Sequence, residues 1–172
     1  KQLTMDIILY NPYSSSGKNI KVAAKLKKEL EKKNPSTLVE VQDLVVIKDV
    51  KEFLSNYNES DRIILLGGDG TIHRIVNAVR GYEIKPQVFM YKAGTGNDFV
   101  RSIDKKSKLV DVKQYLTNLP ELEVNGKKEL IINGAGVGLD GLVCYKVNKS
   151  KQTKNKSNYF LNTVSAFFEF KP

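Results

Sequence analysis

The sequence predicts an α/β fold in which a parallel sheet is covered by helices on both faces. Short apolar runs of strand length alternate with segments whose apolar residues recur at helical spacing, and this alternation is typical of parallel sheets. Three of the apolar runs end in turns rich in glycine or asparagine, and a helical pattern follows each turn. A chain of 172 residues is long enough for one compact core and for part of a second.

The predicted elements alternate from residue 5 onward. Apolar runs predict four strands, at Met5–Tyr10, Leu38–Leu44, Ile63–Leu66 and Val88–Tyr91. Apolar residues at helical spacing predict helices from Ile20 to Asn34, from Val50 to Tyr57 and from Thr71 to about Arg80, and a further short helix after Gly96. Because strands joined by helices run parallel, we expect their carboxyl ends to meet at one edge of the sheet, where ligands bind in such folds.

The pattern changes after Pro120. Leu130–Ile132 predicts an apolar strand, which leads into a glycine-rich turn at Asn133–Asp140. The stretch Lys146–Lys156 contains five lysines and no acidic residue, so we expect an exposed loop there. The stretch Tyr159–Phe170 is apolar and aromatic enough to need a packing partner.

The composition narrows the class of partner. The 28 basic and 19 acidic residues give a net charge of +9, which favours an anionic partner such as nucleotide phosphates or an acidic membrane surface. A solubilising lysine surface is the alternative explanation. Basic residues do not interleave with aromatic ones, so nucleic acid is not expected as a partner. The single Cys144 fits a cytoplasmic protein, and no apolar run approaches the roughly 20 residues that span a bilayer.

Three turns are the candidates for ligand binding: Asn11–Lys18, Gly67–Thr71 and Gly94–Asp98. In a parallel sheet they lie along one edge, where free backbone N–H groups at helix starts stabilise anions, above all phosphate. Glycines let the backbone approach a ligand closely. Asp69 and Asp98 would repel bare phosphate, so Mg²⁺ is the expected companion, because it bridges carboxylate and phosphate oxygens.

Simpler interpretations exist for each of these features. A glycine-rich turn after a strand is usually a tight connection, and Asp98 could cap the following helix. The P-loop pattern fails on both sides of Gly17-Lys18, and the Gly136–Gly141 match to the dinucleotide-binding pattern lies too late in the chain. His73 is interpreted as a structural residue, whereas Lys18 and Lys92 lie beside the predicted phosphate-facing turns.

Together these residues resemble the diacylglycerol kinase catalytic-domain family, which includes bacterial lipid kinases and sphingosine kinases. The resemblance rests on Asn11-Pro12 with Ser16-Gly17, GGDGT at Gly67–Thr71, GTGND at Gly94–Asp98 with Phe99-Val100-Arg101, and Asn133 with Gly138-Leu139-Asp140. The motifs follow the family's order along essentially the whole chain. GGDGT is shared with NAD kinases and phosphofructokinases, whereas GTGND after it is far more specific.

The resemblance implies an ATP-binding α/β domain over residues 1–126 and the start of a β-rich, lipid-side domain over residues 127–172. It implies that Asp69 is catalytic and that Asp98 joins a Mg²⁺ network through water. The implied nucleotide-binding residues are Asn11, Ser16, Gly67, Gly68, Gly70, Thr71, Gly94, Thr95 and Gly96. The implied reaction is transfer of the γ-phosphate of ATP to a lipid hydroxyl, with Mg²⁺, converting diacylglycerol to phosphatidic acid in phospholipid biosynthesis.

The same resemblance implies a cytoplasmic protein that is peripheral to the membrane where its lipid substrate lies. It places the family's general base beyond Pro172, so we expect little activity from these residues alone. The oligomeric state is open, with a homodimer among the options. Two alternatives remain: an NAD kinase-like enzyme with a soluble acceptor, and a non-catalytic nucleotide-binding module. The second gains weight from His73-Arg74, which stands where the family usually has Asn-Glu.

Overall fold

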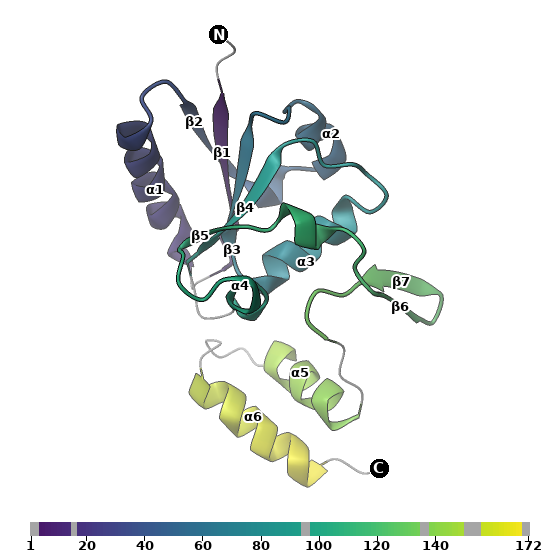
Figure 1. Cartoon of the computed structure of the whole chain (residues 1–172). Coiled ribbons are helices and arrows are strands. Elements are labelled where there is room, and N and C mark those ends of the chain that lie inside the picture. The colour runs from purple at the N-terminus through teal and green to yellow at the C-terminus, as the bar shows by residue number, and fades with distance from the viewer. Residues whose placement is uncertain (1–3, 15–16, 94–96, 135–137, 150–155, 170–172) are drawn as a thin grey trace. The chain divides into compact units, whose positions relative to one another are not determined.

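The computed structural model describes residues 4–14, 17–93, 97–134, 138–149 and 156–169. A five-stranded sheet with the strand order β2-β1-β3-β4-β5 forms its centre (Figure 1). Its strands are β1 (Met5–Tyr10), β2 (Leu38–Asp43), β3 (Arg62–Gly67), β4 (Gln87–Lys92) and β5 (Leu109–Asp111). The first four run parallel, as the sequence predicts, and the short β5 pairs antiparallel with β4 at the sheet edge.

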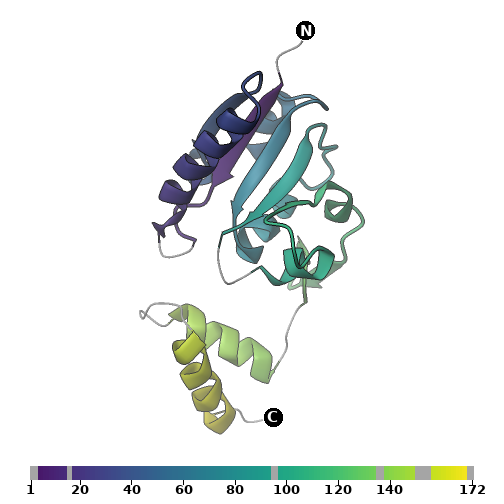
Figure 2. The same cartoon turned by 60° about the vertical axis from the view of Figure 1, so that its left-hand side comes forward.

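Helices cover both faces of this sheet, which confirms the predicted α/β fold (Figures 1 and 2). One face carries α1 (Asn19–Lys33) and the other carries α2 (Val50–Ser55), α3 (Asp69–Ala78) and α4 (Asp98–Ile103). Two short 3₁₀ helices, η2 (Leu44–Val46) and η3 (Lys113–Leu116), complete the second layer. Each predicted helix of this part is present, although α2 ends earlier than expected.

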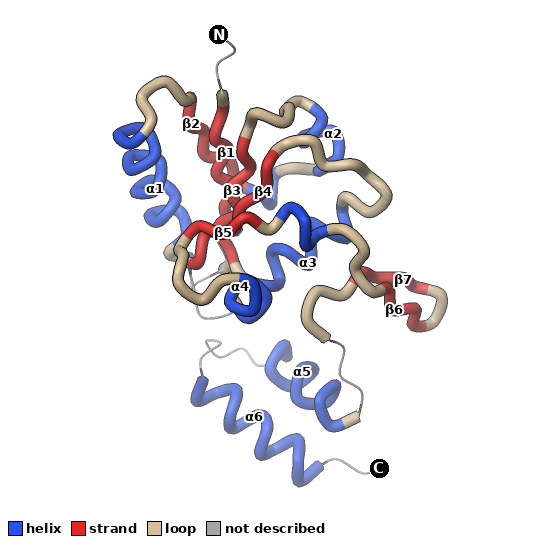
Figure 3. The backbone as a smooth tube through the Cα atoms, viewed as in Figure 1, coloured by secondary structure: helices blue, strands red, loops and turns tan. Residues whose placement is uncertain are grey.

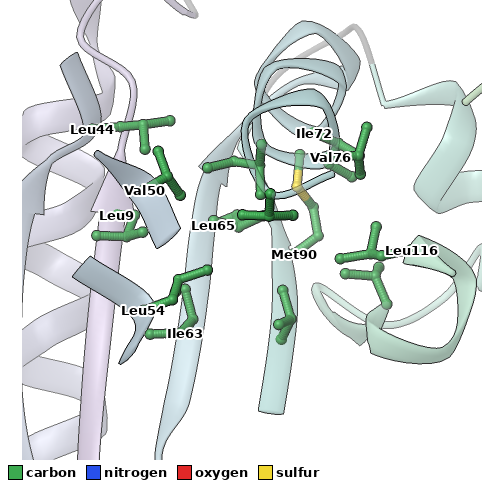
Figure 4. Packing of buried hydrophobic residues seen from close by; sticks show 14 of the residues in the cluster. Leu9, Leu44, Val50, Leu54, Ile63, Leu65, Ile72, Val76, Met90 and Leu116 are labelled. Atoms are coloured by element: carbon green, nitrogen blue, oxygen red, sulfur yellow. The ribbon is translucent and has the colours of Figure 1, made fainter. Parts of the chain in front are cut away.

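The central strand β3 shows why the apolar run in it is continuous. Successive side chains of a strand point to opposite faces, so a strand covered on both sides needs apolar residues at every position. Ile63 and Leu65 pack into the cluster beneath α2 and α3, where Leu9, Ile72, Val76 and Met90 also lie (Figure 4). Ile64 and Leu66 pack into the other cluster, against α1. This double burial holds the carboxyl end of β3 in place.

A β-hairpin follows the sheet, formed by β6 (Glu121–Val124) and β7 (Lys127–Leu130). Asn125 and Gly126 at its tip have φ angles of 50° and 75°, as a two-residue hairpin turn of the Asn-Gly type requires. The expected strand at Leu130–Ile132 was therefore wrong in its bounds. Pairing with β6 places the strand earlier, and the next residues leave it to pack against the core.

The chain divides into two compact units, residues 1–133 and residues 134–172. The predicted boundary between residues 126 and 127 falls inside the hairpin of β6 and β7, and the predicted division into domains stays a prediction. The second unit contains α5 (Leu139–Lys149) and α6 (Lys156–Glu169), which pack together (Figure 1). The β-rich second domain stays a prediction.

The expected lysine-rich loop at 146–156 was partly wrong, because residues 146–149 belong to α5. Val143 of α5 and Ala166 of α6 are both buried, and α5 includes Lys146 and Lys149. Lys146 donates a hydrogen bond to Ser165 Oγ, 2.8 Å away, and pairs with Glu169. Among the residues that the structure describes, no helix combines the length and the apolar character that crossing a membrane requires.

Candidate functional site

The carboxyl ends of β1 and β3 are tied together at one edge of the sheet (Figure 3). The backbone N–H of Asn11, just after β1, donates to the carbonyl of Leu66 in β3 at 3.1 Å. The side-chain Nδ2 of Asn11 donates to Thr71 Oγ1 at 3.2 Å, and Ser14 Oγ lies 3.5 Å from the same hydroxyl. The first two predicted phosphate turns therefore meet, as the parallel sheet led us to expect.

Gly67 is required at the end of β3 because Thr71 occupies the space of a side chain. A Cβ atom built on Gly67 would lie 2.2 Å from Thr71 Oγ1 and 2.7 Å from Thr71 Cβ. Gly70, one turn further on, is exposed and would meet no atom within 4 Å. The two glycines thus differ in kind: Gly67 permits close packing, whereas Gly70 leaves the start of α3 open to a ligand.

Asp69, the first residue of α3, connects three segments of the chain. Its Oδ2 accepts hydrogen bonds from the backbone N–H of Asp98 at 2.9 Å and from Asn133 Nδ2 at 3.1 Å. Its Oδ1 accepts the backbone N–H of Phe99 at 3.3 Å. The Asp69 carboxylate thereby caps α4, whose own N-cap residue Asn97 makes no side-chain capping bond.

The donor set fits a magnesium ion held largely through water. Ionised carboxylates offer about four acceptor positions, so the three hydrogen bonds leave Asp69 able to accept one more contact. The carboxylate of Asp98 is 81% exposed and pairs only loosely with Arg101, at 3.9 Å. Mg²⁺ commonly binds through one or two carboxylates, several waters and substrate phosphates. The described residues contain no cluster of three or more His, Cys, Asp or Glu side chains that would form a closed metal site.

Seven of the predicted site residues gather at this edge: Asn11, Gly67, Gly68, Asp69, Gly70, Thr71 and Asp98. Thr71 is only 1% exposed, so its hydroxyl braces the turn from inside. Ser16, Gly94, Thr95 and Gly96 lie outside the described residues. The predicted roles of all these residues in binding and catalysis stay predictions.

The remaining polar residues that the sequence singled out lie beside the edge. His73 faces Glu129, with 3.7 Å between Nε2 and Oε2, in keeping with its structural interpretation. Lys18 is exposed at the start of α1. The Nζ of Lys92 donates to the backbone carbonyl of Asp104. Hydrogen bonds from Ser107 and then Lys106 lower the pKa of Asp104 to about 2, and the charge of Lys92 adds to this effect.

Sequence reasoning missed two asparagines that hold the site together. Asn19 is fully buried, and its Nδ2 donates to the carbonyl of Asn11 at 3.0 Å and to that of Leu66 at 3.3 Å. Asn133 was part of the family motif without an assigned role, and it contacts Asp69 directly. The burial of Asn19 is not visible in the sequence, and nothing local indicates the partner of Asn133.

A separate cavity of about 470 Å³ lies between the C-terminal end of α3 and η3. Val76, Val79 and Leu116 contribute apolar walls, and Arg80 and Lys113 contribute charge. None of the predicted site residues lines it. The presence of a cavity therefore does not by itself indicate where the predicted site lies.

Comparisons with known proteins point to one family. A model of the diacylglycerol kinase catalytic domain matches residues 6–127. A Staphylococcus epidermidis protein described as a candidate lipid kinase is 31% identical over 116 residues, 63% of this chain and 37% of that protein. The diacylglycerol kinase of Bacillus subtilis is 29% identical over 82 residues, 48% of this chain and 22% of that protein. The chain therefore spans well under half the length of these relatives.

A crystal structure of a candidate diacylglycerol kinase from Bacillus anthracis shares 22% sequence identity, with a TM-score of 0.48. The match covers 74% of this chain and 46% of that one. The family match, by contrast, rests on sequence and includes the turns after β1 and β3. Because it spans more than half of the 172 residues, this chain belongs to the diacylglycerol kinase catalytic domain family.

Proposed function

We propose that the protein is an ATP- and Mg²⁺-dependent lipid kinase that transfers the γ-phosphate to a lipid hydroxyl, with diacylglycerol as substrate and phosphatidic acid as product. The observation that carries the proposal is the position of Asp69. Its carboxylate lies at the start of α3, among the turns that follow β1 and β3 and the start of α4. Membership of the family supports the same reaction class.

The proposed roles of the residues follow from their placement. Backbone N–H groups at the start of the ten-residue α3, around Gly70, would bind nucleotide phosphate, because the N-terminus of a helix attracts anions. Gly68 and Gly70 allow the phosphate to approach the backbone. The hydrogen bond between Asn11 and Thr71 holds the turn after β1 against the turn after β3. Most of the acceleration in phosphoryl transfer comes from such positioning and from charge neutralisation.

Asp69 and Asp98 are the residues that would hold Mg²⁺ in this site. The ion, when bound, supplies neutralisation of the charge on the phosphate oxygens. Three hydrogen bonds to Asp69 fix the direction of its remaining acceptor position. In the transfer itself, the acceptor oxygen bonds to the γ-phosphorus, the bond to the ADP oxygen breaks, and the hydroxyl proton leaves to a base.

We also propose that the protein works at the membrane surface from the cytoplasmic side. Diacylglycerol resides in the bilayer, so the kinase must meet it there. The net charge of +9 supports attraction to anionic lipid headgroups.

The test is a transfer assay with ATP labelled in its γ-phosphate. Diacylglycerol in mixed vesicles and NAD in solution are offered as acceptors, with and without Mg²⁺. We expect label in phosphatidic acid only, dependent on Mg²⁺, and a loss of at least about a hundredfold in kcat for Asp69→Asn. Asp49→Asn is the matched control, because Asp49 also accepts two backbone N–H groups but caps α2, away from the predicted site.

Two outcomes would contradict the proposal in different ways. Label in NAD with none in lipid would identify an NAD kinase-like enzyme. Binding of ATP without transfer to either acceptor, in the full-length protein, would identify a non-catalytic nucleotide-binding module.

A further inference from the structure

One polar stripe of α3 holds the chain segment that contains β6, β7 and Asn133. Asp69, His73 and Asn77 recur along the helix at spacings of four, so they lie on one face, and Arg80 follows in the turn just after the helix. Each contacts the segment at 121–133. The contacts run from Asp69 to Asn133, from His73 to Glu129, from Asn77 to Leu130, and from Arg80 to Glu121 and Lys128.

Asn77 makes the most complete of these contacts. Its Oδ1 accepts the backbone N–H of Leu130 at 2.8 Å, and its Nδ2 donates to the carbonyl of Leu130 at 3.1 Å. The same Nδ2 donates to the carbonyl of His73, one turn earlier in α3, at 2.9 Å. Because both ends of the amide are engaged, neither the position nor the orientation of the Leu130 backbone can change without losing a hydrogen bond.

Each residue from Leu130, which Asn77 binds, to Asn133, which contacts Asp69, is held by its own contact. The backbone N–H of Ile131 donates to the carbonyl of Pro120 at 2.8 Å. Leu130 and Ile132 pack against the core cluster beneath α3. Asn133 then reaches Asp69 Oδ2. The hydrogen bonds of Asn77 therefore fix the position of the backbone that leads to Asn133, and so the position from which its side chain reaches the Asp69 carboxylate.

We infer that Asn77 is a positioning residue for the candidate site, and that it acts by setting Asn133 against the Asp69 carboxylate. It touches neither the carboxylate nor the phosphate-facing turn. Its influence on turnover rests on the proposed function, whereas its influence on Asn133 does not. A plain structural role, anchoring the hairpin alone, is the competing explanation.

Arg80 separates the two explanations because it anchors the same hairpin elsewhere. Its guanidinium pairs with Glu121 and donates to the carbonyl of Lys128 at 3.3 Å. Arg80→Met removes these bonds and leaves the path from Leu130 to Asn133 intact. Asn77→Leu removes the amide and keeps a side chain of similar size.

The first measurement is the NMR resonance of the Asn133 side-chain amide, identified by its absence in Asn133→Ala. We expect Asn77→Leu to move this resonance towards that of an exposed asparagine and Arg80→Met to leave it unchanged. Asn77→Asp keeps the acceptor for the Leu130 N–H and provides an intermediate case if Asn77→Leu does not fold. An unmoved Asn133 resonance in folded Asn77 variants would overturn the inference, whatever the protein's activity.

The second measurement is a double-mutant cycle on lipid phosphorylation. We expect Asn77→Leu and Asn133→Ala each to lower kcat about tenfold with the KM for diacylglycerol unchanged, the loss of one hydrogen bond to a charged group. The double variant should be no slower than Asn133→Ala. Additive losses would contradict the positioning role, and equal losses in Arg80→Met would favour the structural one. If the unmodified protein transfers no phosphate, the proposed function fails and the resonance measurement still decides the inference.

Discussion

At each end of the parallel strands of the central sheet, an aspartate carboxylate accepts backbone N–H groups. We call these two ends the amino edge and the carboxyl edge. At the amino edge, Asp61 follows a turn and precedes β3, and at the carboxyl edge Asp69 follows β3 and begins α3. Each carboxylate accepts two backbone N–H groups: Asp61 from the distant Met5 and the nearby Asn58, and Asp69 from Asp98 and Phe99. Asp61 is 3% exposed, whereas Asp69 lies half-buried beside an open glycine turn. Asp61 is therefore confined to holding the fold, and Asp69 keeps access to a ligand.

The amino edge is closed by its partners. Asp61 accepts the N–H groups of Met5 and Asn58, both at 2.9 Å. Next to it, the buried carboxylate of Asp6 binds the Arg62 guanidinium through two of its nitrogen atoms, and this hydrogen bonding raises the pKa of Arg62. Asp61, Asp6 and Arg62 thus all have partners within the first compact unit. The acceptor aspartates of the two edges therefore differ in accessibility and not in residue type.

The largest expected effect on stability is at the closed edge. Asp61→Ala should lower the free energy of unfolding by about 3 kcal/mol, because it leaves two partly buried N–H groups without their acceptor. Urea denaturation followed by circular dichroism measures this. Asp49→Ala is the matched control: it also removes an acceptor of two N–H groups, but at an exposed helix cap, and should cost about 1 kcal/mol. Equal losses in the two variants would contradict the assignment of a closed edge.

The next effect is at the open edge, where the two glycines should respond differently. Gly67→Ala should destabilise the protein by about 2 kcal/mol, since its Cβ would overlap the Thr71 side chain. Gly70→Ala should leave stability unchanged or raise it slightly, because the site is open and alanine favours a helix. Thermal unfolding compares the two variants. A stable Gly67→Ala protein would show that Thr71 does not brace the turn.

A smaller effect is expected at the buried amide between β1 and β3. Asn19→Leu should cost about 1 kcal/mol, because the carbonyls of Asn11 and Leu66 lose a donor while each keeps a backbone N–H partner. The apolar replacement also removes a buried oxygen, Asn19 Oδ1, that has no partner among the described residues. Urea denaturation checks the cost. A gain in stability would show that the buried Asn19 amide destabilises the fold.

The smallest effect is expected at Asp104, near the carboxyl end of α4. Its pKa is lowered from 3.8 to about 2, so its stabilising contribution is present above the higher value and disappears as the pH falls through the lower one. Asp104→Asn should therefore flatten the decline in stability between about pH 4 and about pH 2. Melting temperatures across this pH range test the sign. An unchanged acid slope would contradict it.

The sequence was sufficient for the parallel part of the fold, because a strand buried on both faces must be apolar throughout, as Ile63–Leu66 is. It was insufficient for β5, whose three residues, Leu109–Asp111, are too few to show a pattern. The Asn125-Gly126 turn did carry a hairpin signal, and it was overlooked. The lysines at 146–149 were misleading because the helix accommodates both: Lys146 contacts Ser165 and Glu169 of α6, and Lys149 is exposed.

The site was predictable only in outline. Glycine-rich turns after parallel strands led us to expect that these turns meet at the carboxyl ends of the strands, and Asp69 does accept the backbone N–H of Asp98 there. The role of these residues stays a prediction. The amide bonds of Asn19 and Asn77 could not be predicted, because each joins residues that are distant in sequence and approach only when the sheet and hairpin are formed.

The most direct test of the account is an NMR titration of this chain with Mg²⁺ and ATP, observing backbone amides at both edges of the sheet. We expect saturable shifts at Gly68, Asp69, Gly70 and Asn11, and none at Met5, Asn58 and Arg62. Asp69→Asn should weaken the binding. Shifts confined to the amino edge, or no saturable shift at the carboxyl edge, would contradict the assignment of the open edge as the nucleotide site.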